Sequence, residues 1–307
     1  MAAGNMKAVK LRIKSVQNTM QITKAMQLVA ASKLRKAKER AETSKPYFQI
    51  MRQTLIEIAR SNTDFMSPYT KQVKNEKWLY VVIAGDRGLA GGYNSNLFKF
   101  MERETRGRDF MVLPIGKKSV EYFQHRGVEI LTEEYAEVAK ISVSDCFGVS
   151  KLICDAYSKG SFGHVLLCYT DFVSMMTQTP CSTSLLPLAD FGEETQDEET
   201  QEGETQETGT RKEETENEGG HAHDLILYEP DSETVFNAIV PEYLAGLLYT
   251  SISISVASEL AARRTAMEAA TDNAGKMIED LSLYYNRARQ ASITQEITEI
   301  VAGAEGN

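Results

Sequence analysis

The two ends of this 307-residue chain each carry a helical apolar pattern far longer than an ordinary globular helix. The first runs from about Lys7 to Arg60 and the second from about Asp231 to Ala302. At roughly 1.5 Å per residue, each could span on the order of 80–100 Å if unbroken, whereas a typical helix has about 11–12 residues. One long helix enters a central unit and another leaves it, which predicts an antiparallel pair that forms a rod.

Both patterns advance in the three- and four-residue steps of a coiled-coil seam. The predicted seam of the first helix is Ile13, Val16, Met20, Thr23, Gln27, Ala30, Leu34, Ala37, Ala41, Phe48, Met51, Leu55 and Ile58. The predicted seam of the last helix is Val256, Leu260, Met267, Ala270, Ala274, Met277, Leu281, Tyr284 and Ala288. Because many of these side chains are small, the two backbones can approach closely. A helical bundle with no special role stays open, since apolar stripes are usually core.

Two segments are too apolar for the free surface of an ordinary bundle. Residues 22–31 are apolar or small on more than one helical face, and residues 293–301 carry few charges. One partner helix cannot cover residues 22–31 on all sides. We therefore expect another protein to enclose the tip of the rod.

The central part of the chain alternates between strand-like and helix-like segments. Strands are expected at 78–84, 110–115, 128–131 and 165–169, and residues 174–188 are expected to close the sheet. Helices are expected at 94–103, 118–125 and 144–158. This alternation predicts a mostly parallel, Rossmann-like sheet.

The predicted fold class is therefore α/β plus a long antiparallel coiled coil, in which the N- and C-terminal helices form a rod on a Rossmann-like α/β domain. We expect three parts: a coiled-coil helix over 1–75, the α/β domain over 76–230, and a second coiled-coil helix over 231–307. A disordered acidic insertion is expected at 191–223, because residues 193–219 hold no large apolar side chain that could bury surface.

Charge is distributed unevenly along the chain. Residues 1–52 hold twelve Lys and Arg against two Glu, and residues 190–220 hold thirteen acidic against two basic residues. The first helix concentrates its cations in one cluster, which consists of Lys33, Arg35, Lys36, Lys38 and Arg40. Such a helix can bind nucleic acid, a membrane surface or an acidic protein loop. We expect no nucleic acid, because the central unit has no basic face or aromatic–basic recognition motif.

Few residues point to catalysis. The glycine-rich stretch 85–92 follows the first strand, where backbone amides can cradle phosphate, but its spacing is neither G-x-G-x-x-G nor a P-loop. A tight turn that needs glycine is the preferred reading. His221 and His223 could indicate a metal but lack further ligands nearby. We expect no catalytic residue, metal or cofactor.

The cysteines and the apolar runs indicate the state of the thiols and whether the chain crosses a membrane. The four cysteines are Cys146, Cys154, Cys168 and Cys181, and they form no C-x-x-C pair, so buried reduced thiols are expected. No uninterrupted apolar run approaches the roughly 18–20 residues that cross a bilayer, so we expect no direct membrane span.

Three strings resemble the gamma subunit of F-type ATP synthases. Residues 22–26 (Ile-Thr-Lys-Ala-Met) with 29–33 are similar to that family's N-terminal signature, and residues 86–94 to its segment after the first strand. Residues 269–274 and 285–296 resemble its C-terminal signature. Ala90 stands where many members have cysteine, and the acidic segment lacks the regulatory cysteine pair of chloroplast members. The resemblance covers nearly the whole chain in the right order.

The resemblance implies a central rotor shaft that couples proton flow and rotation of the c-ring to ATP synthesis or hydrolysis. The implied partners are three alpha and three beta subunits, the small rotor subunits (delta or epsilon) and the c-ring. Chemistry would take place on beta, so this chain would not be an enzyme itself. The expected location is the matrix side of the mitochondrial inner membrane, peripherally bound, with the cytoplasmic side of the bacterial plasma membrane as alternative.

The expected partner-binding residues lie on both long helices. They are Lys24, Met26, Lys33, Arg35, Lys36, Lys38, Arg289, Gln290 and Thr294. The resemblance implies that the last three engage a beta-subunit loop. Two other function classes stay open: a static coiled-coil scaffold, and a nucleotide-binding enzyme with a helical rod whose phosphate site is the loop 85–92.

Overall fold

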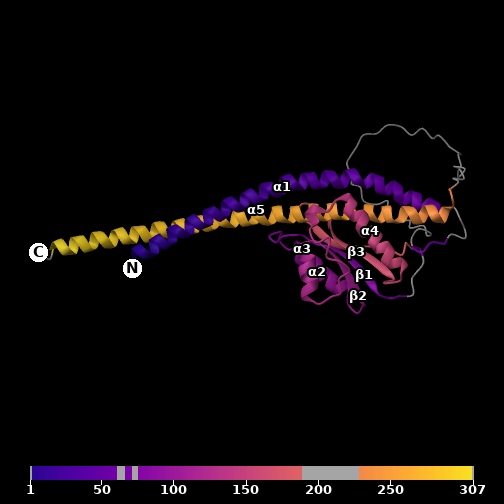
Figure 1. The fold of residues 1–307 in the computed structure, drawn as a ribbon. Coiled ribbons are helices and arrows are strands. Elements are labelled where there is room, and N and C mark those ends of the chain that lie inside the picture. The colour runs from indigo at the N-terminus through magenta and orange to yellow at the C-terminus, as the bar shows by residue number, and fades with distance from the viewer. Residues whose placement is uncertain (1, 61–65, 71–74, 189–227, 306–307) are drawn as a thin grey trace, which may run out of the picture.

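The chain folds into a long two-helix rod with an α/β unit attached to one side of it (Figure 1). A computed structural model describes residues 2–60, 66–70, 75–188 and 228–305. The expected disordered insertion 191–223 lies outside the described residues. Helix α1 (Ala2–Arg60) and helix α5 (Ser232–Glu305) run antiparallel, and α5 continues beyond the first residue of α1 (Figure 1). The rod on an α/β unit is therefore confirmed.

The α/β unit is a four-stranded sheet with helices on both faces. Its strands are β1 (Trp78–Ile83), β2 (Phe110–Ile115), β3 (His164–Phe172) and β4 (Gln178–Leu186). Its helices are α2 (Tyr93–Glu104), α3 (Lys117–His125), the short 3₁₀ turn η1 (Val138–Lys140) and α4 (Val143–Ser158). The strand order is β2-β1-β3-β4. Strand β1 pairs in parallel with β2 and β3, and β4 is antiparallel to β3.

Alternate residues of β1 divide the core between the two faces of the sheet. Leu79, Val81 and Ile83 are fully buried in a large cluster with α4, α5 and the C-terminal part of α1. Tyr80 and Val82 are fully buried in a smaller cluster with α2 and α3. A strand covered on both faces reads as a continuous apolar run, which is how β1 appears in the sequence.

One expected strand is wrong. Residues 128–131 form no named strand, and Ile130 makes only an isolated parallel bridge with Val112. The surrounding residues are half-exposed. The short apolar run therefore follows the edge strand β2 without extending the sheet.

The seam predicted for the first helix agrees with the structure at every position, since each of those side chains is buried or partly buried. The seam predicted for α5 fails at two positions. Met277 and Tyr284 are 44% and 50% exposed, and the partly buried positions are Ile278 and Tyr285. The predicted positions Leu281 and Ala288 are partly buried, so the seam keeps its course and only the order of its three- and four-residue steps differs from the prediction.

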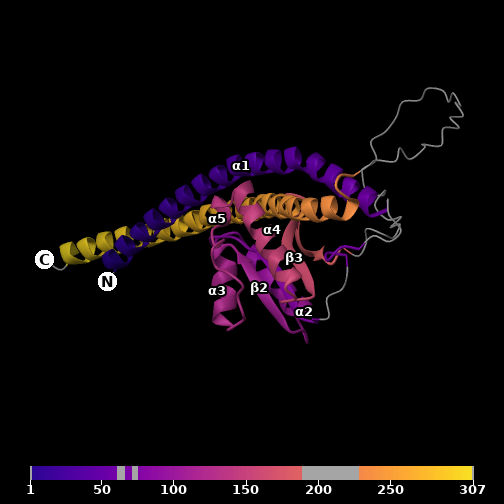
Figure 2. The ribbon, with the colours of Figure 1, turned by 45° about the vertical axis from the view of Figure 1, so that its right-hand side comes forward.

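At one close contact between the two helices, the ring of Phe48 of α1 lies against Gly246 of α5. A Cβ atom built on Gly246 would lie 1.8 Å from Cε1 of the Phe48 ring. Further along the rod, the hydroxyls of Thr23 and Thr271 form a hydrogen bond of 2.7 Å across the seam. Helix α1 is curved along its length (Figure 2), and between these two contacts Ala30, Leu34 and Ala37 of α1 are buried in one cluster with residues of α5. Pro46 lies inside α1, and a proline removes a backbone donor and bends a helix.

Helix α5 is long and apolar enough, by length and composition alone, to cross a membrane. However, 67% of its most apolar stretch is buried within the structure, as expected of a core helix. Helix α5 contributes Leu244, Leu248 and Ile252 to the large buried cluster on one face of the sheet.

Candidate functional site

The cationic cluster of α1 is largely solvent-exposed. Lys33, Arg35 and Lys36 are exposed, whereas Lys38 is partly buried and its Nζ lies 4.0 Å from the centre of the Phe172 ring. Arg35 makes an ion pair of 3.7 Å with Glu39, but both side chains are more than half exposed. Exposed pairs of this kind contribute little. Arg40 is exposed as well, so the structure leaves four of the five cations of this cluster open to a partner and turns Lys38 toward the α/β unit.

The apolar segment of α1 presents side chains to solvent, as its sequence indicated. Ile22 is 60%, Leu28 64% and Val29 54% exposed. Lys24 is also exposed, and Met26 is partly buried near the seam. This face of the rod has no cover among the described residues, so it fits an enclosing partner.

The tip of α5 exposes both its polar and its apolar predicted residues. Arg289, Gln290 and Thr294 are exposed, and Thr294 Oγ1 donates to the backbone oxygen of Gln290 at 2.9 Å. Four large apolar side chains of the tip are also exposed: Ile293, Ile297, Ile300 and Val301. Because Arg289 is exposed here, only a partner could bury its guanidinium.

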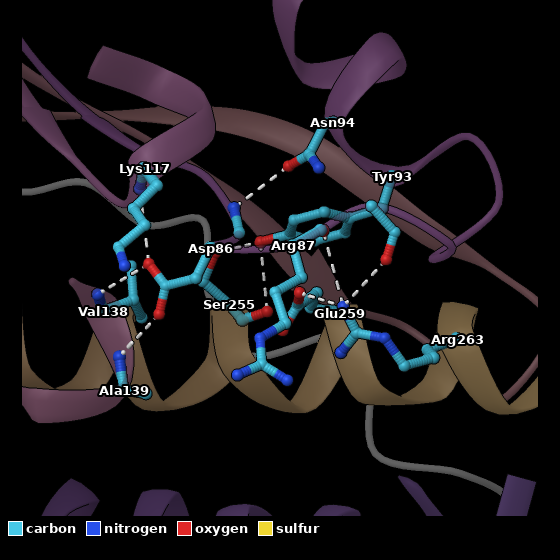
Figure 3. A network of polar contacts seen from close by, with 12 residues as sticks. Asp86, Arg87, Tyr93, Asn94, Lys117, Val138, Ala139, Ser255, Glu259 and Arg263 are labelled. Carbon is cyan, nitrogen blue, oxygen red and sulfur yellow. Dashed lines mark hydrogen bonds and ion pairs between the residues drawn. The ribbon is translucent and has the colours of Figure 1, made fainter. Parts of the chain in front are cut away.

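The glycine-rich loop 85–92 is built around Asp86 (Figure 3). Its Oδ1 accepts from the backbone amides of Lys117 and Val138 at 3.3 and 3.0 Å, and its Oδ2 from that of Ala139 at 3.1 Å. The amide of Gly85 donates to Asn94 Oδ1 at 3.0 Å. Lys117 begins α3, so Asp86 accepts from the free amide at the N-terminus of that helix and links the loop to α3. The contacts agree with a tight structural turn.

A largely buried ion pair within α5 contacts the same loop. Arg263 and Glu259 of α5 lie 2.6 Å apart, with 14% and 13% of their side chains exposed. The Arg263 guanidinium also donates to the backbone oxygen of Gly88 at 3.3 Å (Figure 3). A Cβ atom at Gly85 would lie 2.6 Å from Glu259 Oε1, so glycine there makes room for the carboxylate. The loop therefore joins the sheet, α3 and the rod.

A buried tyrosine completes this junction. The Tyr93 hydroxyl lies 2.7 Å from the Ser255 hydroxyl, and it donates to the Ser255 backbone oxygen at 3.1 Å. Burial raises the pKa of Tyr93 far above its ordinary value, although the hydrogen bond with Ser255 opposes the shift. The phenol therefore stays neutral and serves as a fixed hydrogen-bonding group.

Sequence reasoning missed Glu259, Arg263 and Tyr93 as members of one junction. The only local signal is the four-residue spacing of Glu259 and Arg263 on a helix, which places the two side chains on one face. Nothing in the sequence indicates that these two side chains face a turn more than 160 residues earlier in the chain.

Replacing Asp86 with alanine is expected to lower the free energy of unfolding by about 1–3 kcal/mol, because it removes the acceptors of three amides at the loop. Asp86→Asn, which keeps one carbonyl acceptor, should retain part of that stability. Urea unfolding of the two variants, followed by circular dichroism, measures the difference. An alanine variant as stable as the wild type would contradict the structural role assigned to this carboxylate.

The cysteines and acidic groups offer no metal centre within the part of the chain that the structure describes. All four cysteines are free, and three are buried. Burial raises the pKa of Cys146 to about 12 and that of Cys154 to about 11. Thiols with such values are poor nucleophiles. The possible histidine ligands His221 and His223 lie outside the described residues.

Comparisons with known proteins agree with this architecture. The family model described as ATP synthase matches residues 5–306. An ATP synthase gamma chain of Ruminococcus albus is 45% identical, with 96% of each chain covered. One of Xanthomonas campestris is 40% identical, with 99% of each covered.

Solved structures share the fold. A chain of the Euglena gracilis mitochondrial ATP synthase superposes with a TM-score of 0.65 at 17% identity, and 99% of this chain and 95% of that chain are covered. A chain of the central stalk and c-ring of the Tetrahymena thermophila mitochondrial enzyme gives 0.53 at 22% identity, covering 81% and 99%.

Proposed function

The chain belongs to the ATP synthase gamma chain family. We propose that it is the central rotor shaft of a proton-translocating F-type ATP synthase. The observation that carries the proposal is the rod itself. Its tip exposes apolar side chains on both helices, whereas its base is packed into the core of an α/β unit. A shaft that rotates inside a ring of partner subunits needs one end that the ring encloses and another end that is held by its own domain.

The mechanism is mechanical coupling through an asymmetric rod. A single two-helix rod can present a given face to only one of three identical partners at a time. It can shift the states of those partners only by as much as its contacts with each state differ. Since coupling between sites is reciprocal, torque can drive ATP synthesis and ATP hydrolysis can drive torque.

We propose that ATP chemistry takes place on the beta subunits and that this chain is a non-catalytic subunit. Its partners would be three alpha and three beta subunits around the rod, with the small rotor subunits (delta or epsilon) and the c-ring at the base. The division into 1–75, 76–230 and 231–307 is kept as part of the proposal.

The two relatives that are 40–45% identical come from bacteria, whereas the mitochondrial structures are under 25% identical and show the fold alone. The bacterial relatives support a peripheral subunit of a membrane-associated complex and give no support to the mitochondrial location. We place the chain on the cytoplasmic side of a bacterial plasma membrane. Fractionation of the source cells, with the complex found in the plasma-membrane fraction, tests this location.

The cationic face of α1 is proposed to contact acidic loops of the beta subunits through Lys33, Arg35, Lys36 and Lys38, next to Lys24 and Met26. Changing the first four together to glutamate should lower ATP-driven proton pumping, and more strongly at low salt, where charges are less screened. Single alanine variants serve as the matched control and should be mild, since an exposed pair contributes about 0–1 kcal/mol. Unchanged pumping in the quadruple variant would exclude this contact.

The tip residues Arg289, Gln290 and Thr294 are proposed to form the main polar contact with one beta subunit. Arginine offers a rigid fork of donors, and the other two side chains both donate and accept. Their combined change to alanine should reduce steady-state ATPase activity and proton pumping while the complex still assembles. Purified, fully assembled complex is the material for this measurement. Wild-type values for both activities would rule out the assignment.

Two alternative function classes are separated by simple observations. A static scaffold would hold ATPase subunits without rotation, so attaching a bead to the rod and watching for ATP-driven rotation distinguishes it from a rotor. A nucleotide-binding enzyme would bind ATP on the isolated chain. Asn94 argues against that class, because its side-chain oxygen already accepts from the amide of Gly85, one of the loop amides that a phosphate would need.

A further inference from the structure

Strand β4 forms an open edge of the sheet. It stands last in the strand order β2-β1-β3-β4 and pairs with β3 alone. Among the described residues, none outside β3 forms a backbone hydrogen bond with positions 179–184. The opposite edge differs, because the backbone of Val112 in β2 donates to Glu129 at 2.9 Å and accepts from Leu131 at 2.8 Å. The β4 edge is therefore the one that can accept another chain.

The sequence of β4 gives this edge little protection. Natural sheets protect exposed edge strands with charged side chains, prolines or bulges. Residues 178–186 hold no charged side chain, and the one register shift against β3 lies at the end of the pairing, between Val165 and Leu166. Four polar side chains of β4 are exposed: Thr179, Ser182, Thr183 and Ser184. A nine-residue edge of this kind pairs readily with another extended chain.

Pro180 indicates which backbone groups face outward. A proline inside a sheet lies where its missing amide would point away from the neighbouring strand. Because the direction of the backbone groups alternates along an antiparallel strand, the even-numbered residues of β4 turn these groups to the open side. The amides of Ser182 and Ser184 therefore face outward, whereas the odd-numbered amides of residues 179–183 face β3.

A hollow of about 270 Å³ lies beside the start of this edge, between the sheet, α2 and α5. Its lining includes Asn96, Thr170, Met176, Gln178, Pro180 and Ala266. Thr170 is only 2% exposed, and its hydroxyl has no hydrogen-bond partner among the described residues. The Tyr93 phenol lies close to it but is bonded to Ser255. A buried hydroxyl without a partner is unfavourable, so the hollow lacks a group that bonds to Thr170.

We propose that an extended segment of a partner subunit adds to β4 as a further strand and places one large side chain in this hollow. Strand addition takes affinity from main-chain hydrogen bonds and specificity from pockets for alternate side chains. A residue paired opposite Pro180 has its Cβ about 4.5–5.5 Å from that of Pro180, on the same face. Its side chain is thus directed to the hollow, which is smaller than the roughly 300–1,000 Å³ of small-molecule sites.

The chemistry of the edge defines the partner segment. Its backbone is extended, and its side chains next to the uncharged positions of β4 are neutral. The inserted side chain has an apolar body, which contacts Met176 and Ala266, and a polar end, which bonds to Thr170, as in tyrosine or tryptophan. A second copy of this chain is the wrong occupant, because edge-to-edge pairing would join two rods where the proposed shaft is single. The inference rests on the proposed function, which the rotation experiment tests separately.

Hydrogen exchange measured at single amides tests the strand pairing. In the purified complex, the amides of Ser182 and Ser184 should exchange at least about tenfold more slowly than in the isolated full chain. The odd-numbered amides of residues 179–183 should be protected in both samples and report that the sheet is intact. Equal exchange of the two outward amides in both samples would overturn the proposal. Protection that rises with the concentration of the isolated chain would also overturn it, since a second copy would then cover the edge.

A proline substitution removes one of the outward amides. In the complex, Ser182→Pro should return the exchange of Ser184 to within about twofold of its rate in the isolated chain. Ser182→Ala keeps the amide and is the matched control, so Ser184 should stay protected. If Ser182→Pro disturbs the odd-numbered amides, Ser184→Pro replaces it, with the amide of Ser182 as the readout. Full protection in a proline variant with an intact sheet would contradict strand addition.

Filling the hollow tests the inserted side chain. Ala266→Leu should make the amide of Ser182 exchange at least about threefold faster in the complex, because the added atoms occupy the space of the partner's side chain. Glu268→Leu, at an exposed position two residues further along α5, is the matched control and should leave this rate unchanged. An unchanged rate in the Ala266→Leu complex would overturn the insertion into the hollow.

Discussion

Replacing Gly246 with alanine is expected to lower the free energy of unfolding by about 1–3 kcal/mol, although alanine favours helices more than glycine does. The added Cβ would lie 1.8 Å from Cε1, 1.9 Å from Cδ1 and 2.6 Å from Cζ of Phe48. All three distances are far below van der Waals contact, so a small movement of the ring does not make room for the new atom. Either the ring leaves its place or the two helices separate at this contact.

Gly275 provides the matched control on the same helix. A Cβ atom there meets nothing within 4 Å, so Gly275→Ala should raise stability by up to about 1 kcal/mol through helix propensity alone. Adding Phe48→Ala to Gly246→Ala should relieve the clash, so the two changes together should cost less than the sum of their separate effects. Thermal unfolding of the four variants measures these differences. Equal stability of the two glycine variants would contradict the close contact.

The rod could be predicted because its signal is long. Steps of three and four residues sustained over thirteen seam positions of the first helix specify one face of that helix, and every one of those positions is at least partly buried. The errors lie where the signal is short or extrapolated. Residues 128–131 offer only three apolar positions, and the order of the seam steps was wrong at Met277 and Tyr284.

The candidate contact surfaces were predictable for a different reason. Large apolar side chains such as Leu28 and Ile300 are unfavourable on the solvent-exposed face of a rod. The sequence alone shows that these segments carry more apolar residues than one partner helix can cover. The junction at loop 85–92 was not predictable, because its meaning depends on which distant residue faces the turn. Gly85 reads as a turn glycine, and only the fold shows that it makes room for Glu259.

Removing one partner of the Glu259–Arg263 pair is expected to have the largest effect of any single change at this junction. Glu259→Leu should destabilise the chain by about 3–5 kcal/mol, because it leaves a mostly buried guanidinium without its carboxylate. The backbone oxygen of Gly88, at 3.3 Å, is a neutral acceptor and compensates only in part. Arg263→Met should be costly for the converse reason, since the Glu259 carboxylate would stay beside Gly85 without a cation.

The double variant Glu259→Leu/Arg263→Met removes both charges at once. It therefore distinguishes the interaction free energy of the pair from the cost of leaving one buried charge without its partner. Well-packed apolar residues often replace a buried ion pair at little cost, so the double variant should be more stable than either single one. Urea unfolding of all four chains gives the coupling free energy of the cycle. If the two single losses simply add, the two side chains do not interact and the ion pair assigned here is wrong. If the double variant costs much less than the sum of the single losses, the two charges depend on each other for their burial between α5 and the turn after β1. A shaft that carries torque from its base to its tip requires such a firm contact between the α/β unit and α5.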